Sequence, residues 1–202
     1  MRNVNLMFVC GTCFFVSTFL SAQSWSLAKE KNEVSVYTRK IEGWGIKEYK
    51  AVFVVKASLN KVVKVLKDVP GRYNWLHNTI EIREVERKGN AVSVYNLVDA
   101  PWPVSDRDNI TTFTFNELSP TKVRVDMQVV KTHAKAPIYE GIVRIEKLQG
   151  FWLLTDRGNG RTEVLQQCVA EPGGSIPDWL ANSAVVDTPY QSMYKLKRYI
   201  EQ

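Results

Sequence analysis

Histidine and cysteine are scarce in this sequence, and their scarcity limits the chemistry that it can support. The 202 residues include two histidines, His77 and His133, and three cysteines. The two histidines are not spaced as metal ligands. The sequence also has no His-Glu-x-x-His motif, Gly-x-Ser-x-Gly elbow or phosphate-binding loop, and its one closely spaced cysteine pair, Cys10 and Cys13, lies in the N-terminal apolar run. We therefore expect no metal, no cofactor and no enzymatic activity.

A stripe of like charge is also missing. The chain has 27 Lys and Arg against 21 Asp and Glu, which gives a formal net charge of +6, but the two signs are interleaved, as at residues 83–88. Proteins that bind nucleic acids gather their basic residues on one face, so we expect no nucleic acid partner. The mild positive excess suits anionic lipid surfaces and ordinary solubility equally well.

The N-terminus has the pattern of a secretory signal peptide. One basic residue, Arg2, precedes an almost unbroken apolar run at residues 6–20, and small and polar residues follow at 21–24. The run is too short to cross a bilayer, which takes about 20 apolar residues. We predict that residues 1–24 are a signal peptide and that the protein is exported, to a periplasm or to the medium. A retained membrane anchor is the alternative.

Removal of residues 1–24 leaves a single cysteine, Cys168, so the mature chain can form no internal disulfide. Small secreted domains often depend on disulfides, but about 180 residues are enough for one domain to be stable through burial alone. No repeat, low-complexity tract or linker interrupts residues 25–202. We expect a single domain that is monomeric.

Alternating apolar and polar residues predict an antiparallel sheet with one buried face. Glycine-containing turns separate most of the alternating segments. The predicted strands are residues 34–38, 49–55, 92–98, 110–115, 123–129, 141–146, 151–155 and 163–169.

Two segments have apolar residues at helical spacing instead. The first covers residues 58–69, with Ser58 as its N-cap. The second covers residues 176–200, where Pro189 either kinks one long helix or begins a second one that Thr188 caps. The predicted order is a short helix, two strands, a helix, about six strands and the C-terminal helix. Because strands twist, a long sheet can curl around this last helix and leave an apolar cavity between them.

Three segments resemble the START family, the lipid-transfer domains related to the steroidogenic acute regulatory protein. They are APWPVSDRDNI at 100–110, GGSIPDWLAN at 173–182 and VPGRYNW at 69–75. Asn109 stands where the family commonly has Phe after the Arg-Asp pair. The resemblance covers nearly all of residues 25–200. It implies an α+β helix-grip fold, in which a curved antiparallel sheet wraps around a long C-terminal helix and encloses an apolar cavity.

The resemblance also implies that the cavity binds and transfers a lipid or similar apolar small molecule without covalent chemistry. The loop before the Arg-Asp pair and the C-terminal helix would form its mouth. A functional Arg107 in such a cavity would need a carboxylate partner or a ligand head group, because an unpaired buried charge is costly. The alternative is that Arg107 forms an ordinary ion pair at the surface that anchors the strand. The ligand-binding residues that we expect are Arg107, Asp106, Trp102, Tyr95, Met193 and Leu196.

Other interpretations remain open for this sequence. Aromatase and cyclase enzymes share the helix-grip architecture and would need an acid or base in the cavity, such as Tyr95, His77 or Arg107. An envelope protein that binds a partner through the outer face of the sheet is a third function. A lipid carrier is expected to touch a membrane surface transiently, and Trp102 suits such an interface. The alternative is that Trp102 packs as a lid on the core.

Overall fold

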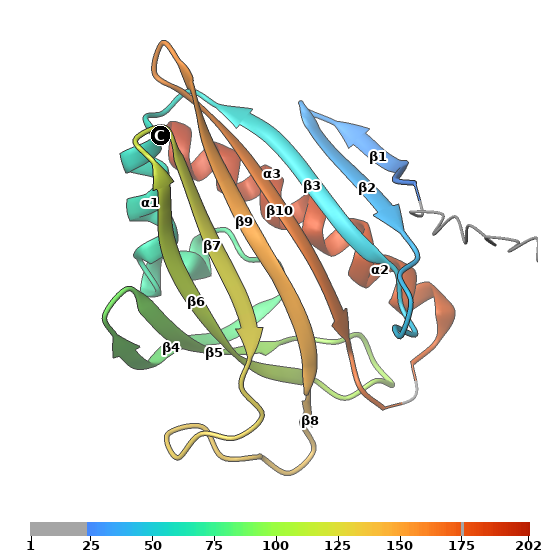
Figure 1. Cartoon of the computed structure of the whole chain (residues 1–202). Coiled ribbons are helices and arrows are strands. Elements are labelled where there is room, and N and C mark those ends of the chain that lie inside the picture. The colour runs from blue at the N-terminus through green and yellow to red at the C-terminus, as the bar shows by residue number, and fades with distance from the viewer. Residues whose placement is uncertain (1–23, 175) are drawn as a thin grey trace, which may run out of the picture.

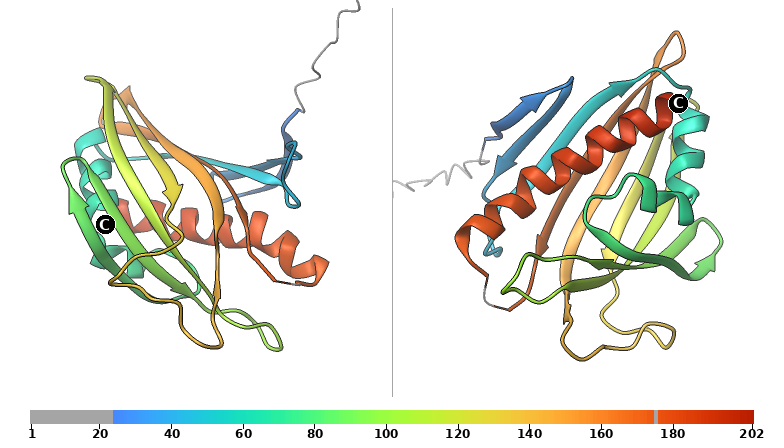
Figure 2. Two further views of the ribbon diagram at one scale, coloured as in Figure 1. Left: turned by 60° about the horizontal axis from the view of Figure 1, so that its bottom comes forward. Right: turned by 180° about the vertical axis from the view of Figure 1, so that it is seen from behind.

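One strongly curved sheet makes up most of the molecule, and the last helix lies across its concave face (Figures 1 and 2). The computed structural model describes residues 24–174 and 176–202. The predicted signal peptide lies outside these residues, apart from Ser24. The α+β helix-grip fold, with an antiparallel sheet wrapped around a C-terminal helix, is confirmed.

The strands follow the order β1-β2-β3-β10-β9-β7-β6-β5-β4, and β8 pairs in parallel with β6. All neighbours along the main path are antiparallel, as alternating sequences with one buried face predict. The strands are β1 (Ser26–Lys31), β2 (Val34–Arg39), β3 (Glu48–Val55), β4 (Thr79–Lys88), β5 (Ala91–Val98), β6 (Arg107–Ser119), β7 (Lys122–Val129), β8 (Val143–Arg144), β9 (Lys147–Gly158) and β10 (Arg161–Glu171).

The structure corrects the predicted order in three places. The first element among the described residues is strand β1, not a short helix. Strand β4 was not predicted, because its sequence TIEIREVERK is mostly polar and it lies at the edge of the sheet with most side chains in solvent. The strand expected at residues 141–146 is reduced to the two residues of β8.

Helix α1 (Leu59–Lys67) begins as predicted. The hydroxyl of Ser58 accepts a hydrogen bond from the backbone N–H of Lys61 at 3.3 Å, which confirms Ser58 as the N-cap. The apolar side of the helix is buried through Leu59, Val62 and Leu66. A short 3₁₀ helix, η1 (Pro70–Asn74), follows at once.

The C-terminal helical region is divided into α2 (Asp178–Val185) and α3 (Asp187–Glu201). The division falls at Val186, which has a non-helical φ of −126° and ψ of −61°. The second alternative, two separate helices, is therefore the observed one, but α3 begins at Asp187 rather than at Pro189, and Thr188 is not its cap. Pro189 lies in the first turn of α3, where its missing N–H costs the helix nothing because those donors have no helical partner.

The main core lies between the inner face of the sheet and helices α1 and α3. Alternate residues of the strands, such as Val34 and Val36 on β2, meet Met193, Leu196 and Ile200 of α3 there. Each fully buried side chain of this kind contributes about 1.5–3 kcal/mol to the free energy of unfolding. Within the described residues, no helix has the length and apolar character needed to cross a membrane.

Polar contacts tie α3 to the hairpin of β1 and β2. Lys29 pairs with Asp187 at 2.6 Å, the amide of Asn32 donates to the hydroxyl of Tyr190 at 3.1 Å, and Lys197 pairs with Glu33. Helix α2 instead packs chiefly against α3. The N-terminal hairpin thus holds α3 along its length.

Candidate functional site

A cavity of about 370 Å³ lies between the inner face of the sheet and the C-terminal helices. This volume falls in the range of about 300–1,000 Å³ that is usual for small-molecule sites. Residues 99–101 and several residues of helix α2 also line the cavity. Its apolar walls include Leu66, Trp75, Phe113, Phe115, Val125 and Trp152.

The cavity wall contains buried polar atoms without a hydrogen-bond partner among the described residues. They are Nε1 of Trp75, Oγ1 of Thr79, Oδ1 of Asn96 and Nε of Arg107. Thr79 and Arg107 both pair in register with Val98 of β5, and Asn96 is the preceding residue of β5 on the same face. Three of the four atoms therefore belong to one corner of the wall. Because buried polar groups are nearly always hydrogen-bonded, this corner is suited to the polar group of a ligand.

Arg107 is the charged member of this corner. It is 7 % exposed, and its Nη1 donates to the carbonyl oxygen of Ser105. Within the described part of the chain it forms no ion pair. Burial lowers the pKa of its guanidinium, and the charge of Asp106 partly opposes this effect. Since a guanidinium stays protonated at neutral pH, the cavity wall holds a positive charge that no carboxylate of the described residues contacts.

A second buried arginine, Arg72, also lines the cavity. Its Nε and Nη2 donate to the carbonyl oxygen of Leu66 at 3.2 and 2.6 Å, and its guanidinium carbon lies 4.0 Å from the centre of the Phe113 ring. Burial lowers its pKa to about 9. Its donors hold the end of α1, so its first role is structural. Arg72 was not among the expected ligand-binding residues, although the family-like segment VPGRYNW contains it.

Of the six expected ligand-binding residues, Arg107 lines the cavity and the other five do not. Met193 and Leu196 belong to α3, and their side chains are buried in the main core. The carboxylate of Asp106 accepts a hydrogen bond from the backbone N–H of Ala100 at 3.0 Å and so closes the loop between them. Trp102, in this same loop, is 91 % exposed.

Tyr95 lies on the other face of the sheet, which corrects the expectation that it projects into the cavity. Its neighbours along β5, Val94 and Asn96, line the cavity, so strand alternation turns Tyr95 outward. There it packs with Ile110 and Ala136 in a second, smaller cluster. The alternation at residues 92–98 already implied this orientation.

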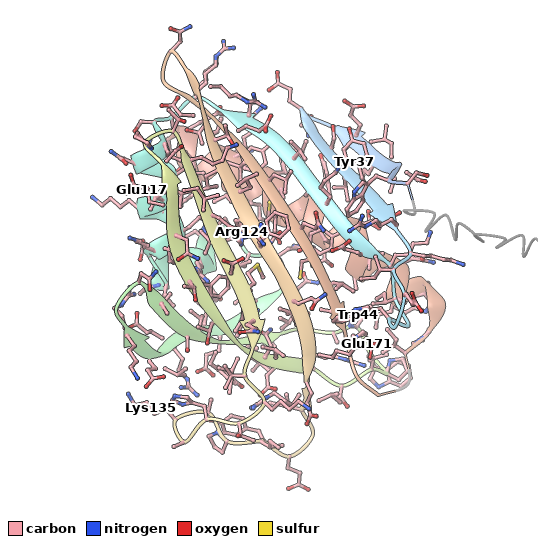
Figure 3. All side chains as sticks on the ribbon, in the orientation of Figure 1. Tyr37, Trp44, Glu117, Arg124, Lys135 and Glu171 are labelled. Carbon is pink, nitrogen blue, oxygen red and sulfur yellow. The ribbon has the colours of Figure 1, made fainter. Side chains whose placement is uncertain are left out.

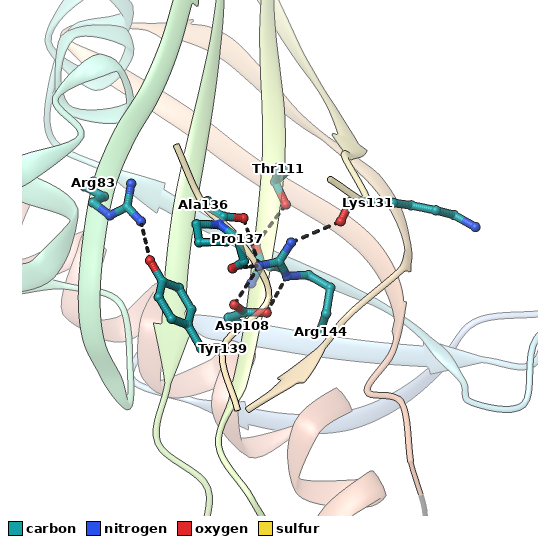
Figure 4. A network of polar contacts seen from close by, with 9 residues as sticks. Arg83, Asp108, Thr111, Lys131, Ala136, Pro137, Tyr139 and Arg144 are labelled. Atoms are coloured by element: carbon teal, nitrogen blue, oxygen red, sulfur yellow. Dashed lines mark hydrogen bonds and ion pairs between the residues drawn. The ribbon is translucent and has the colours of Figure 1, made fainter. Parts of the chain in front are cut away.

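Asp108, the residue after Arg107, belongs to a polar network on this outer face (Figure 4). Arg144 donates to both of its carboxylate oxygens, from Nε at 2.5 Å and from Nη2 at 2.9 Å. The two side chains are 1 % and 3 % exposed, and the pairing raises the pKa of Arg144. The network fastens the segment after β7 onto β6, because Arg144 also donates to the carbonyl oxygens of Lys131, Ala136 and Pro137.

His77 lines the cavity close to α3. Its backbone N–H donates to the hydroxyl of Ser192 at 3.0 Å, and its Nδ1 lies 3.4 Å from Nζ of Lys195. Burial and then the charge of Lys195 lower the pKa of His77, so the ring is neutral at pH 7. No group of His, Cys, Asp or Glu that could hold a metal ion occurs in residues 24–174 and 176–202.

We place the mouth of the cavity at helix α2 and the loop at residues 99–101, because the lining residues Asp99, Pro101 and Trp179 are exposed there. Trp179 of α2 lines the cavity and is 55 % exposed. Ala100 and Pro101 line it as well, so Trp102 stands just outside the rim. The mouth therefore has one tryptophan that reaches the cavity and another that faces solvent.

A family model described as START domain matches residues 15–190. The chain belongs to the START domain family. This START domain is 36% identical to an uncharacterized protein of Pseudomonas aeruginosa, with 100% of each chain covered. It is 29% identical to the phosphatidylcholine transfer protein of Bos taurus, over 82% of this chain and 78% of the relative.

Solved structures agree with this assignment. A STAR-related lipid transfer protein from Xanthomonas axonopodis superposes with a TM-score of 0.79 and 34% identity, covering 88% of this START domain and 99% of the other chain. An aromatase/cyclase from Streptomyces sp. R1128 superposes with a TM-score of 0.53 over 76% of this chain and 93% of the other, but at 17% identity it shows the fold alone. The functionally named relatives at higher identity are lipid transfer proteins.

Proposed function

We propose that this START domain binds one lipid in its cavity and carries it between membranes without changing it covalently. The main support is Arg107, a buried charge that lies in a mostly apolar cavity and has no carboxylate partner within residues 24–174 and 176–202. The oxygen atoms of a lipid head group would satisfy Arg107, while the apolar chain would cover the walls. Binding would thus remove the cost of buried polar atoms that lack partners.

The relatives support a carrier more than an enzyme of the cyclase type. The phosphatidylcholine transfer protein is similar over most of the chain, whereas the aromatase/cyclase shares only the fold. Tyr95, one of the candidate acids for catalysis, faces away from the cavity. We therefore favour transfer of an unmodified lipid.

Transient membrane contact belongs to the same proposal. Trp102 and Trp179 are both exposed. Trp102 follows the cavity-lining Pro101 in the sequence, and Trp179 lines the cavity itself. Tryptophan suits the interface between head groups and acyl chains.

The basic residue and apolar run before Trp25 support export of the domain to a periplasm or to the medium. The exported domain is proposed to be a monomer. N-terminal sequencing of protein from its host should find a chain that begins near Gln23 or Trp25, and an intact Met1 on membrane-bound protein would contradict export.

Native mass spectrometry of protein purified from its own host tests the carrier function. We expect one lipid per chain, released unchanged on unfolding and replaced from donor vesicles. Protein that holds no lipid and takes up none from vesicles would contradict the proposal. Turnover of a polyketide-like substrate would indicate the enzyme instead.

A further inference from the structure

A second polar cluster lines the cavity away from the Arg107 corner. The hydroxyl of Tyr49 donates to Oε1 of Gln166 at 3.0 Å, and Nε2 of Gln166 donates to the sulfur of Met127 at 3.9 Å. Cys168 lies next to Gln166 on the same face of β10. All four side chains line the cavity, and Gln166 is 7 % exposed.

The contacts with Tyr49 and Met127 together set the orientation of the Gln166 amide, with Oε1 toward the Tyr49 hydroxyl and Nε2 toward the sulfur. The opposite orientation would place the amide oxygen against the thioether of Met127, which has no proton to donate. The amide nitrogen carries two N–H donors, and a thioether is a weak acceptor. Among the described residues that sulfur is the one acceptor that this nitrogen contacts. A buried donor of this kind is normally paired with an oxygen.

The cluster differs from the Arg107 corner because it is uncharged. Burial holds the pKa of the Tyr49 phenol well above its usual range and raises the pKa of the Cys168 thiol to about 12. Both groups are therefore protonated at neutral pH. A neutral amide donor is suited to a hydroxyl or carbonyl oxygen rather than to an anion. The nearby cation, Arg72 on the Phe113 ring, already donates to the carbonyl oxygen of Leu66.

Strand register separates the two polar regions. Met127 pairs with Phe113 of β6, and Arg107 begins that strand. The six residue steps from Arg107 to Phe113 span about 20 Å of strand at roughly 3.3 Å per residue, and the curvature of the sheet shortens the direct path. Phe113 and Trp152 line the cavity as well, so a ligand that reaches both polar regions has an apolar stretch between its polar groups.

We propose that Gln166, held in place by Tyr49, is a second hydrogen-bonding subsite, for a neutral oxygen in the chain of the bound lipid. The subsite rests on the proposed carrier function and adds the class of ligand. This class is an elongated amphiphile whose chain carries a hydroxyl or carbonyl group remote from the head group.

Octadecanoic acids that differ only in the position of one hydroxyl group test the subsite. Each isomer competes with plain octadecanoic acid for the cavity, and mass spectrometry measures the bound ratio. We expect the wild-type protein to prefer at least one isomer hydroxylated far from the carboxylate by about fivefold, the effect of one hydrogen bond. Gln166→Leu should lose this preference and keep the plain acid, and Tyr49→Phe should lower the preference.

Gln167→Leu is the matched control. Gln167 is the next residue of β10, and its amide donates to Oε1 of Glu48 at 2.7 Å on the other face of the sheet. This variant should keep the preference for the hydroxylated isomer.

Each remaining outcome decides between the two proposals. If the wild-type protein prefers no isomer, or if the preference survives Gln166→Leu, the subsite is wrong and the carrier function stands. If the wild-type protein retains none of the acids and no lipid from vesicles, the carrier function fails and the subsite fails with it. If Gln166→Leu binds no acid because it does not fold, a full preference in Tyr49→Phe would overturn the subsite.

Discussion

Arg107 and Asp108 are adjacent in the sequence, yet β6 turns them to opposite faces of the sheet. On the outer face, Asp108 receives two hydrogen bonds from Arg144, and Arg144 uses its other donors on backbone carbonyls (Figure 4). On the inner face, Arg107 contacts one carbonyl oxygen and leaves its Nε unpaired. One Arg-Asp motif therefore supplies a pair that stabilises the fold and a charge that is available to a ligand.

The outer face of the sheet repeats this pattern with weaker pairs. Arg124 contacts Asp126 at 2.6 Å, and Lys147 contacts Glu171 at 2.7 Å (Figure 3 labels Arg124 and Glu171). Exposed pairs of this kind contribute only about 0–1 kcal/mol each, because water already solvates both charges. The polar atoms without partners lie on the inner wall instead. The polar groups of the outer face thus contact water and one another, whereas those of the inner face are the ones that we propose contact a ligand.

The largest expected effect comes from breaking the outer pair. Asp108→Asn leaves the buried guanidinium of Arg144 without its counter-charge, so the free energy of unfolding should fall by about 3–5 kcal/mol. Urea unfolding of the lipid-free protein measures the loss. Asp126→Asn, which breaks an exposed pair with Arg124, is the control and should cost less than about 1 kcal/mol. Equal small losses in both variants would show that the Asp108 pair is not a stabilising element.

Arg107→Met, on the inner face, should reduce lipid retention and leave the stability of the protein nearly unchanged. No carboxylate loses a partner, so we expect the free energy of unfolding of the lipid-free protein to change by less than about 1 kcal/mol. Lipid retention should fall by about tenfold to a hundredfold, since hydrogen bonds to a charged group contribute about 1.5–3 kcal/mol. Vesicle competition measures retention, and urea unfolding measures stability. A stability loss as large as that of Asp108→Asn, with retention unchanged, would reverse the assignment of the two faces.

Most of the sheet could be predicted because its inner face is continuous and apolar, which imposes alternation on β2, β3, β5 and β7. Strand β4 escaped prediction because an edge strand with few buried side chains needs no alternation. Pro189 indicated a break in the C-terminal helical region, but its exact place at Val186 has no signal in the sequence, since this side chain makes no capping hydrogen bond.

The inner polar residues could have been found more fully from the sequence. Asn96 interrupts the apolar side of β5, and Gln166 interrupts that of β10, where Val164 and Cys168 flank it. A polar residue at an inward position is a candidate for a ligand contact. Thr79 could not be found in this way, because β4 was not predicted. Arg107 was found only through its resemblance to a family motif.

Cys168 gives the inner wall a measurable pH response. Burial raises the pKa of its thiol to about 12, compared with an ordinary value of 9.0. The folded state therefore keeps a proton that the unfolded state loses above pH 9, so this contribution to stability is complete below pH 9 and declines as the pH rises toward 12. Between pH 9 and 10.5 we expect a loss of about 2 kcal/mol. Urea unfolding at several pH values should show this loss as a steeper decline in wild type than in Cys168→Ala, and parallel declines would contradict it.

Trp179 and Trp102 lie inside and outside the cavity mouth, and their replacement should have the smallest effects of the variants considered. Because the β1–β2 hairpin holds α3 through Lys29 and Glu33, we expect the mouth to open by movement of α2 and of the loop that carries Trp102. Trp179 lines the cavity, so Trp179→Ala should weaken equilibrium binding as well as transfer. Trp102 is outside the wall and should act only when the mouth meets a bilayer.

We therefore expect Trp102→Ala to slow lipid exchange between vesicles by about fivefold, close to 1 kcal/mol, while equilibrium affinity stays the same. An open mouth exposes apolar surface, and contact with acyl chains lowers the cost of that exposure. Removing the side chain that anchors this contact raises the barrier to opening without altering the closed, ligand-bound state. A fluorescent lipid reports the exchange rate and the affinity separately. If the affinity of Trp102→Ala collapses while exchange stays as fast as in wild type, Trp102 is a wall of the cavity and the gate lies elsewhere.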